Sequence, residues 1–142
     1  MTECGIHKLI ADVAVVAEDQ VLMVRYSDDN RYDHQTGWFL PDDLLKHLED
    51  PEEAARRLLS DQIGVVVDTL FLSHVESFQG KDGTWHLAFH YVIQMEKQPD
   101  VTMSKDVDSF EWFYLDQLPL RTDVAHRGWA LDTIREILKR AS

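Results

Sequence analysis

The residues with the clearest chemical potential lie in an acidic stretch in the first half of the chain. Carboxylate oxygens are the ligands that magnesium prefers in proteins. One interpretation is therefore a divalent-cation site built from Asp42, Asp43, Glu49, Asp50 and Asp61. The other interpretation is structural, because Asp42-Asp43 suits a solvated turn and Asp50 suits the cap of a helix.

A helix is expected to position the second half of this stretch. Asp50 can accept hydrogen bonds from free backbone amides, and Pro51 is of the type favoured at the first helical position. We expect the helix to run to Ile63 and to end at Gly64, where a left-handed backbone costs little. Side chains three and four residues apart then share one helical face.

The rest of the chain predicts a mixed sheet with helices on its faces, which is an α/β fold class. Alternating and continuous apolar runs predict strands, and a broad apolar face near the end of the chain predicts a second helix. The strands are expected at about residues 8–17, 21–26, 38–40, 65–77, 85–95 and 109–114, and the second helix at about 125–140.

The segment from Trp38 to Val65 resembles the Nudix box, G-x5-E-x7-R-E-U-x-E-E-x-G-U, in which U is aliphatic. An alignment without gaps places Gly64 at the last glycine, Arg57 at the arginine and Glu49 at the first glutamate. Residues 111–119 look like the late strand and turn of the same family. The resemblance implies a Nudix-type α/β/α sandwich, with one domain spanning residues 1–142.

The box departs from the family pattern where the family holds its metal. In the family, glutamates of the box helix bind one to three magnesium ions, which bridge a diphosphate and activate water. The three positions here carry Leu58, Asp61 and Gln62, and only Asp61 is anionic. This degenerate Nudix box predicts impaired metal binding. We also expect Leu58 to project into a smaller, more apolar pocket beside the helix.

The resemblance implies a reduced set of site residues. Glu49, Arg57 and Asp61 stand at positions that serve catalysis in the family. Glu49 and Asp61 would be the surviving metal ligands, with Asp106 where some family members add an acid. Loop solvation is the alternative for Asp106, and a structural Glu49–Arg57 pair is the alternative for those two. Mg²⁺ or Mn²⁺ is the expected cofactor if the protein is active; otherwise it would need none.

Basic and imidazole side chains offer further candidates. Arg25, Arg31 and Lys46 are the expected contacts for substrate phosphate. His86 and His90 share one face of a predicted strand. A strand separates side chains four residues apart by roughly 13 Å, so one metal ion cannot readily bind both.

The composition argues against nucleic-acid and membrane partners. A formal charge of −12 over 142 residues argues against a nucleic-acid groove, which needs clustered Lys and Arg. No apolar run approaches the roughly 20 residues of a membrane helix. The single Cys4 and a start without a secretory pattern fit the cytoplasm. The oligomeric state is left open, with a homodimer as one option.

Two functional hypotheses follow from the resemblance. The first is a Nudix-fold protein that binds a nucleotide or diphosphate metabolite with family catalysis impaired. The second is an active, divergent hydrolase that uses metal-activated water on a nucleoside diphosphate linked to another moiety. Metal binding separates the two.

Overall fold

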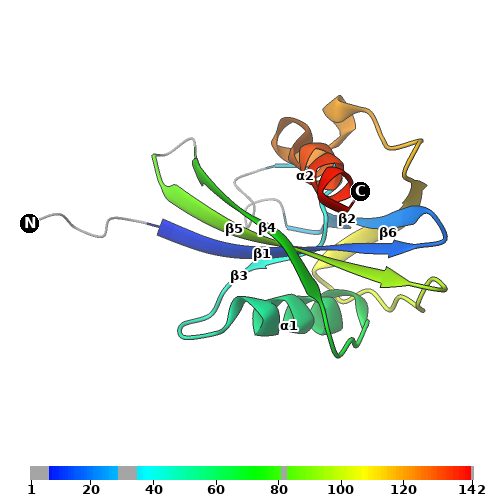
Figure 1. Ribbon diagram of the computed structural model, residues 1–142, viewed down its shortest axis with the longest axis horizontal. Helices are drawn as coiled ribbons and strands as arrows, with labels where there is room; N and C mark the ends of the chain where they lie inside the picture. The colour runs from blue at the N-terminus through cyan, green and yellow to red at the C-terminus, as the bar shows by residue number, and fades with distance from the viewer. Residues whose placement is uncertain (1–6, 29–34, 81–82, 142) are drawn as a thin grey trace, which may run out of the picture.

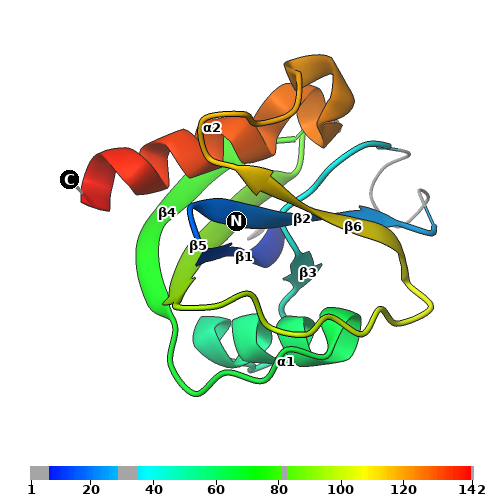
Figure 2. The same cartoon turned by 90° about the vertical axis from the view of Figure 1, so that its right-hand side faces the viewer.

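The computed structural model describes residues 7–28, 35–80 and 83–141. Its centre is a six-stranded sheet, with one helix packed on each side (Figures 1 and 2). The α/β/α sandwich expected from the sequence is therefore confirmed. All elements below join this one sheet or cover it.

The sheet is mixed. Its path runs β4-β5-β1-β2-β6, and β3 pairs with β1 off this path. The pairing of β1 with β5 is parallel, whereas the other pairings are antiparallel. The strands are β1 (His7–Ala17), β2 (Gln20–Tyr26), β3 (Asp42–Leu44), β4 (Phe71–Gln79), β5 (Trp85–Met95) and β6 (Val107–Tyr114).

Two predicted strands are misplaced. Trp38 and Phe39 form only isolated bridges, and the paired strand is β3, directly after Pro41. The strand expected from residue 65 begins at Phe71, because residues 65–70 follow an irregular path. Both segments are apolar because they are buried without forming a regular strand, as Val65 and Leu70 are.

Helix α1 (Pro51–Ile63) has the predicted bounds. Gly64 ends it in the left-handed conformation, with φ 68°, and its amide donates to the carbonyl of Ser60. Asp50 precedes the helix, but its side chain makes no capping hydrogen bond. That part of the prediction is wrong, and the fixed φ of Pro51 remains as the local start signal.

Helix α2 (Ala125–Ala141) begins irregularly, after the short 3-10 helix η2 (Arg121–Asp123). His126, Arg127 and Gly128 have positive φ angles of 51°, 56° and 87°. Such angles strain side chains other than glycine. The regular part of α2 therefore starts at about Trp129, and this kinked turn sets where the indole lies.

The sheet separates two apolar cores. Alternate residues of β1 point to opposite sides. Ala11, Val13 and Val15 pack on the α1 side, whereas Ala14 and Val16 pack on the α2 side. In the part of the chain that the structure describes, neither helix is long and apolar enough to cross a membrane.

Candidate functional site

Arg57 anchors the turn that precedes α1. Its Nε donates to Glu49 Oε2 at 2.8 Å and its Nη2 to Glu49 Oε1 at 3.1 Å. Nη1 donates to Asp43 Oδ2 at 3.0 Å, and Nη2 also donates to the carbonyl of Leu44 at 3.0 Å. The predicted Glu49–Arg57 ion pair is thus present and is bidentate, the strong geometry for such pairs. One guanidinium ties α1 to the turn and to β3.

The contacts between Arg57 and Glu49 shift the pKa values of both groups. The hydrogen bond from Arg57 lowers the pKa of Glu49, against the opposing effect of partial burial. The same bond, with the help of Asp43, raises the pKa of Arg57. The backbone amide of Lys46 also donates to Glu49 Oε1 at 2.9 Å. Both oxygens of the Glu49 carboxylate therefore accept hydrogen bonds from the protein.

Two of the three box positions on α1 are buried. Leu58 has no exposed surface and belongs to the core between α1 and the sheet. Gln62 is also buried. Its Nε2 donates to the carbonyl of Asp42 at 2.7 Å, and its Oε1 accepts from the Tyr26 hydroxyl at 2.8 Å. Gln62 therefore joins α1 to β3 and β2 through neutral hydrogen bonds.

Leu58 does not project from the helix as predicted. Its side chain has no exposed surface and packs into the core between α1 and the sheet. The box alignment itself still agrees with Gly64 at the helix end and Arg57 on Glu49. A leucine at this position does not point where the family's carboxylate points. Burial of its apolar surface lowers the free energy of the folded state, so the side chain turns into the core.

The three predicted metal ligands lie in different surroundings. Glu49 is held by Arg57, while Asp61 on α1 and Asp106 before β6 are exposed. Within residues 7–28, 35–80 and 83–141, no group of three or more His, Cys, Asp or Glu side chains is arranged to hold a metal ion. Magnesium dehydrates reluctantly and needs several hard oxygens. Among the described residues, the structure brings no such set of oxygens together at these three positions.

Two of the three predicted phosphate contacts lie among the described residues. Arg25 lies over the Trp38 ring, with its Cζ 4.2 Å from the ring centroid. Lys46 is exposed in the turn before α1. Arg31 lies outside the described residues. Trp38 belongs to the core, as the sequence suggested.

A polar cluster around His90, on the α2 side of the sheet, was not predicted from the sequence. The Nδ1 of His90 is 2.7 Å from Asp12 Oδ1, and its Nε2 is 2.9 Å from Glu76 Oε1. Glu76 Oε1 also accepts from Trp129 Nε1 at 3.1 Å. His90 is fully buried, and the His74 ring centroid lies 4.6 Å from its own. The sequence feature that could have indicated this cluster is Asp12, a charged residue inside the apolar run of β1.

The cluster holds a buried positive charge. Burial by itself lowers the pKa of His90, but the charge and hydrogen bond of Asp12 and those of Glu76 raise it to about 9. His90 is therefore an imidazolium at neutral pH, and both ring nitrogens donate. The hydrogen bond from His90 lowers the pKa of Glu76. Burial and the neighbouring charge of His90 lower the pKa of His74.

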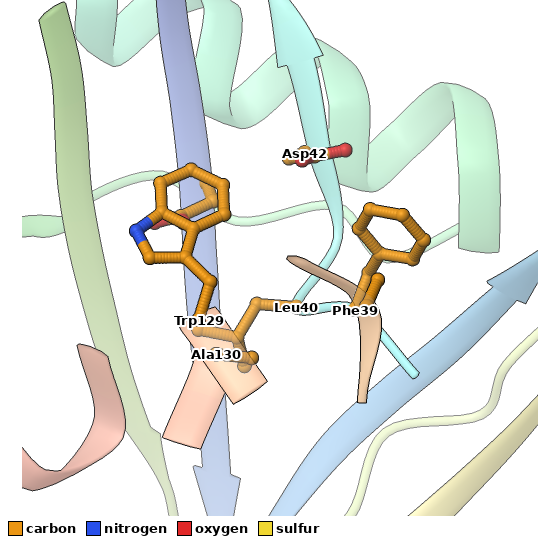
Figure 3. Close-up of a pocket in the computed structure, with 7 residues that line it drawn as sticks. Phe39, Leu40, Asp42, Trp129 and Ala130 are labelled. Carbon is orange, nitrogen blue, oxygen red and sulfur yellow. The ribbon is translucent and has the colours of Figure 1, made fainter. Parts of the chain in front are cut away.

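A narrow hollow of about 10 Å³, room for roughly one water molecule, lies beside this cluster. Figure 3 shows the Trp129 and Phe39 rings on opposite sides of it, with Asp42 at one end and Leu40 and Ala130 at the other. The residues that line it are Asp12, Phe39, Leu40, Asp42, Ala125, Trp129 and Ala130.

A model of the NUDIX domain matches residues 7–132. The chain belongs to the NUDIX domain family. Solved structures with the same fold include the MutT NUDIX hydrolase of Burkholderia pseudomallei, with 19% identity and a TM-score of 0.75 over 93% of this chain and 98% of that one. The MutT protein of Methanosarcina mazei Go1 has 14% identity and a TM-score of 0.77 over 99% of each chain.

A third NUDIX structure is the NUDIX domain of NrtR from Shewanella oneidensis, solved with ADP ribose. It shares 20% identity, with a TM-score of 0.73 over 94% of this chain and 90% of that one. No curated protein matches the chain. At such identities the structural likeness establishes the NUDIX fold alone.

Replacing Arg57 by alanine should destabilise the protein. The change leaves two carboxylates and the carbonyl of Leu44 without their shared donor, and disruption of a partly buried ion pair costs roughly 2 kcal/mol or more. Thermal unfolding would measure this. Arg56→Ala is the matched control, because Arg56 makes a partly exposed pair with Glu52 and a long contact to the carbonyl of Asp68. Equal melting temperatures for the two variants would contradict a structural role.

Proposed function

We propose that this NUDIX protein binds a small nucleotide-derived or diphosphate-containing metabolite without the magnesium-dependent hydrolysis of its family. The observation that carries the proposal is the state of the box helix. Leu58 is buried in the core. The side-chain amide of Gln62 is hydrogen-bonded to the Tyr26 hydroxyl and to the Asp42 carbonyl. Asp61 is then the one carboxylate among the three box positions.

Electrostatics supports this proposal. A magnesium ion leaves its water shell only for several oxygen ligands, and charged carboxylates attract it most. Two box positions offer no charge, and both Glu49 oxygens already accept hydrogen bonds from Arg57 and Lys46. A diphosphate would approach a chain of charge −12 without a metal ion to bridge it. Its contacts would therefore depend on basic side chains, for which we propose Arg25, Arg31 and Lys46.

The ligand class is inferred from the family and its solved members. The NrtR domain was solved with ADP ribose, and an Ap4A hydrolase of C. elegans was solved as a binary complex. ADP ribose and Ap4A are both nucleotide-derived molecules. We extend that class to this chain as part of the proposal.

The test is an activity and binding panel on the natural protein. We expect little phosphate or nucleotide release from ADP-ribose, nucleoside triphosphates or dinucleoside polyphosphates with Mg²⁺ or Mn²⁺. We also expect at least one of these compounds to raise the melting temperature in metal-free buffer, since ligand that binds only the folded state stabilises it. Robust metal-dependent turnover would refute the proposal and favour the divergent hydrolase. Asp42, Asp43 and Asp106 would then be the next residues to replace.

A further inference from the structure

We infer that the edge strand β4 is a dimerisation surface, which pairs in antiparallel fashion with β4 of a second copy of this chain. β4 ends the path of the sheet, and Figure 2 shows it at the border opposite β6. Among the described residues, β5 is the only strand that pairs with β4. The backbone groups along the outer side of β4 therefore have no strand partner, and such an edge is a template for another strand. The inference concerns a subunit contact and does not depend on the proposed ligand.

The exposed side chains of β4 are uncharged. They are Phe71, Leu72, Val75, Ser77 and Gln79. Proteins commonly protect the edges of their sheets with charged residues. β6, at the opposite edge, follows this rule, because its Asp108 and Glu111 are exposed. The one acidic residue of β4 is Glu76, whose Oε1 accepts hydrogen bonds from His90 and Trp129 on the α2 side. In a chain with a net charge of −12, this uncharged edge is where a second copy meets the least repulsion.

An apolar strip continues from β4 onto the α1 side of the sheet. Leu72 pairs with Tyr91 and Val75 with Phe89, and both β5 residues pack in the core on the α1 side. Their partners on β4 therefore point to the same side. Helix α1 packs mainly on β1 and β3 and leaves this border uncovered, since Leu72 is 50% exposed, Val75 45% and Trp85 51%. A second copy would remove apolar side chains from water that one copy leaves exposed.

The sequence of β4 is complementary to itself about Val75. A bulge between Leu72 and His74 ends the regular part of the strand, which runs on to Gln79. Antiparallel pairing centred on Val75 places the two copies of Val75 opposite each other, and His74 of each copy opposite Glu76 of the other. An imidazole can donate to a carboxylate, whereas a centre at Glu76 would bring two like charges together. The contact uses the same surface on both copies, so it closes as a dimer.

Self-association can be measured by sedimentation equilibrium over a wide range of protein concentrations. In about 0.15 M salt, where charges are screened beyond roughly 8 Å, we expect the natural chain to approach twice the mass of one chain. Val75→Lys should weaken this association about tenfold or more, because two lysines would face each other at the centre.

Leu120→Lys is the matched control. Leu120 is 71% exposed and lies between β6 and η2, so the variant adds the same charge away from β4 and should associate like the natural chain. Circular dichroism would verify the folding of both variants. The mass of one chain at every concentration would overturn the inference and leave the edge to a strand of another protein. Unchanged association of the folded Val75 variant would also overturn it.

Cysteine cross-linking tests the register. Directly opposed Cα atoms in an antiparallel pair are about 4.5–5.5 Å apart, within the range that a disulfide spans. In a Cys4→Ser background, we expect Val75→Cys to form a covalent dimer with oxidised glutathione. Gln79→Cys is the control, because its two copies would lie roughly 27 Å apart in this register and should not cross-link. Equal cross-linking of the two variants would indicate random collision and overturn the inference, as would the absence of a covalent Val75→Cys dimer.

Discussion

Replacing Leu58 by glutamate should destabilise the protein strongly in metal-free buffer. Leu58 has no exposed surface and packs with the core beneath α1. A carboxylate there loses its hydration and gains no cationic partner, which costs on the order of 3 kcal/mol or more. Urea unfolding with EDTA present would measure the loss. A change within about 0.5 kcal/mol would mean that the α1 face opens more easily than its packing indicates.

Magnesium should recover part of that loss once Gln62 is also replaced by glutamate. The double variant Leu58→Glu with Gln62→Glu places three acids, with Asp61, at the family positions of one helix. Their mutual repulsion is relieved when a divalent ion binds, so Mg²⁺ or Mn²⁺ should raise the melting temperature of this variant. Leu58→Gln with Gln62 unchanged is the neutral control and should show no such rise. A double variant without metal response would point to the Asp42-Asp43 turn, which lacks the glycines of the family box.

The stability of the natural protein should fall as pH rises from about 6.5 to about 9. His90 has a folded-state pKa of about 9, above its ordinary value of 6.5. Its charged form is therefore stabilised by folding. The stabilisation that the His90 charge gives is complete below about pH 6.5, where His90 is protonated in both the unfolded and the folded protein. It is lost as the pH passes the folded-state pKa. The difference between the two pKa values corresponds to roughly 3 kcal/mol of stability.

Urea unfolding at intervals across this range would measure the effect. His90→Gln should flatten the profile between pH 6.5 and 9, whereas His86→Gln should retain the slope, because His86 bonds only to the Thr84 carbonyl and stacks on Phe78. His74 does not interfere, because its lowered pKa confines its own titration to the acid side of this window. A flat profile for the natural protein would show that His90 is neutral in the folded state.

Features encoded by neighbouring residues could be predicted from the sequence. Pro51 and Gly64 bound α1 because both act through their own backbone angles. The Glu49–Arg57 pair followed from the family spacing, since Glu49 lies just before α1 and Arg57 lies near its middle. The capping bond expected from Asp50 did not form, which shows that residue type alone does not fix a side-chain rotamer.

Features that depend on distant pairing could not be predicted. Asp12 and His90 are 78 residues apart in sequence and meet only because β1 and β5 are parallel partners at that position. The bond from Gln62 to the Asp42 carbonyl depends in the same way on how α1 settles on β3. Neither the strand register nor the turn at residues 126–128 has a local signature, so the polar cluster and the hollow were absent from the prediction.

The position of β1 in the sheet also bears on how the chain reaches this fold. β1 is the earliest described strand, yet it pairs in parallel with β5 from His7↔Trp85 to Ala17↔Met95. During synthesis, its apolar residues must wait for Met95 to leave the ribosome before the central pairing can form. Contacts of such long sequence separation slow folding and leave hydrophobic segments exposed to aggregation. Newly made chains of this protein should therefore depend on chaperones until β5 is complete.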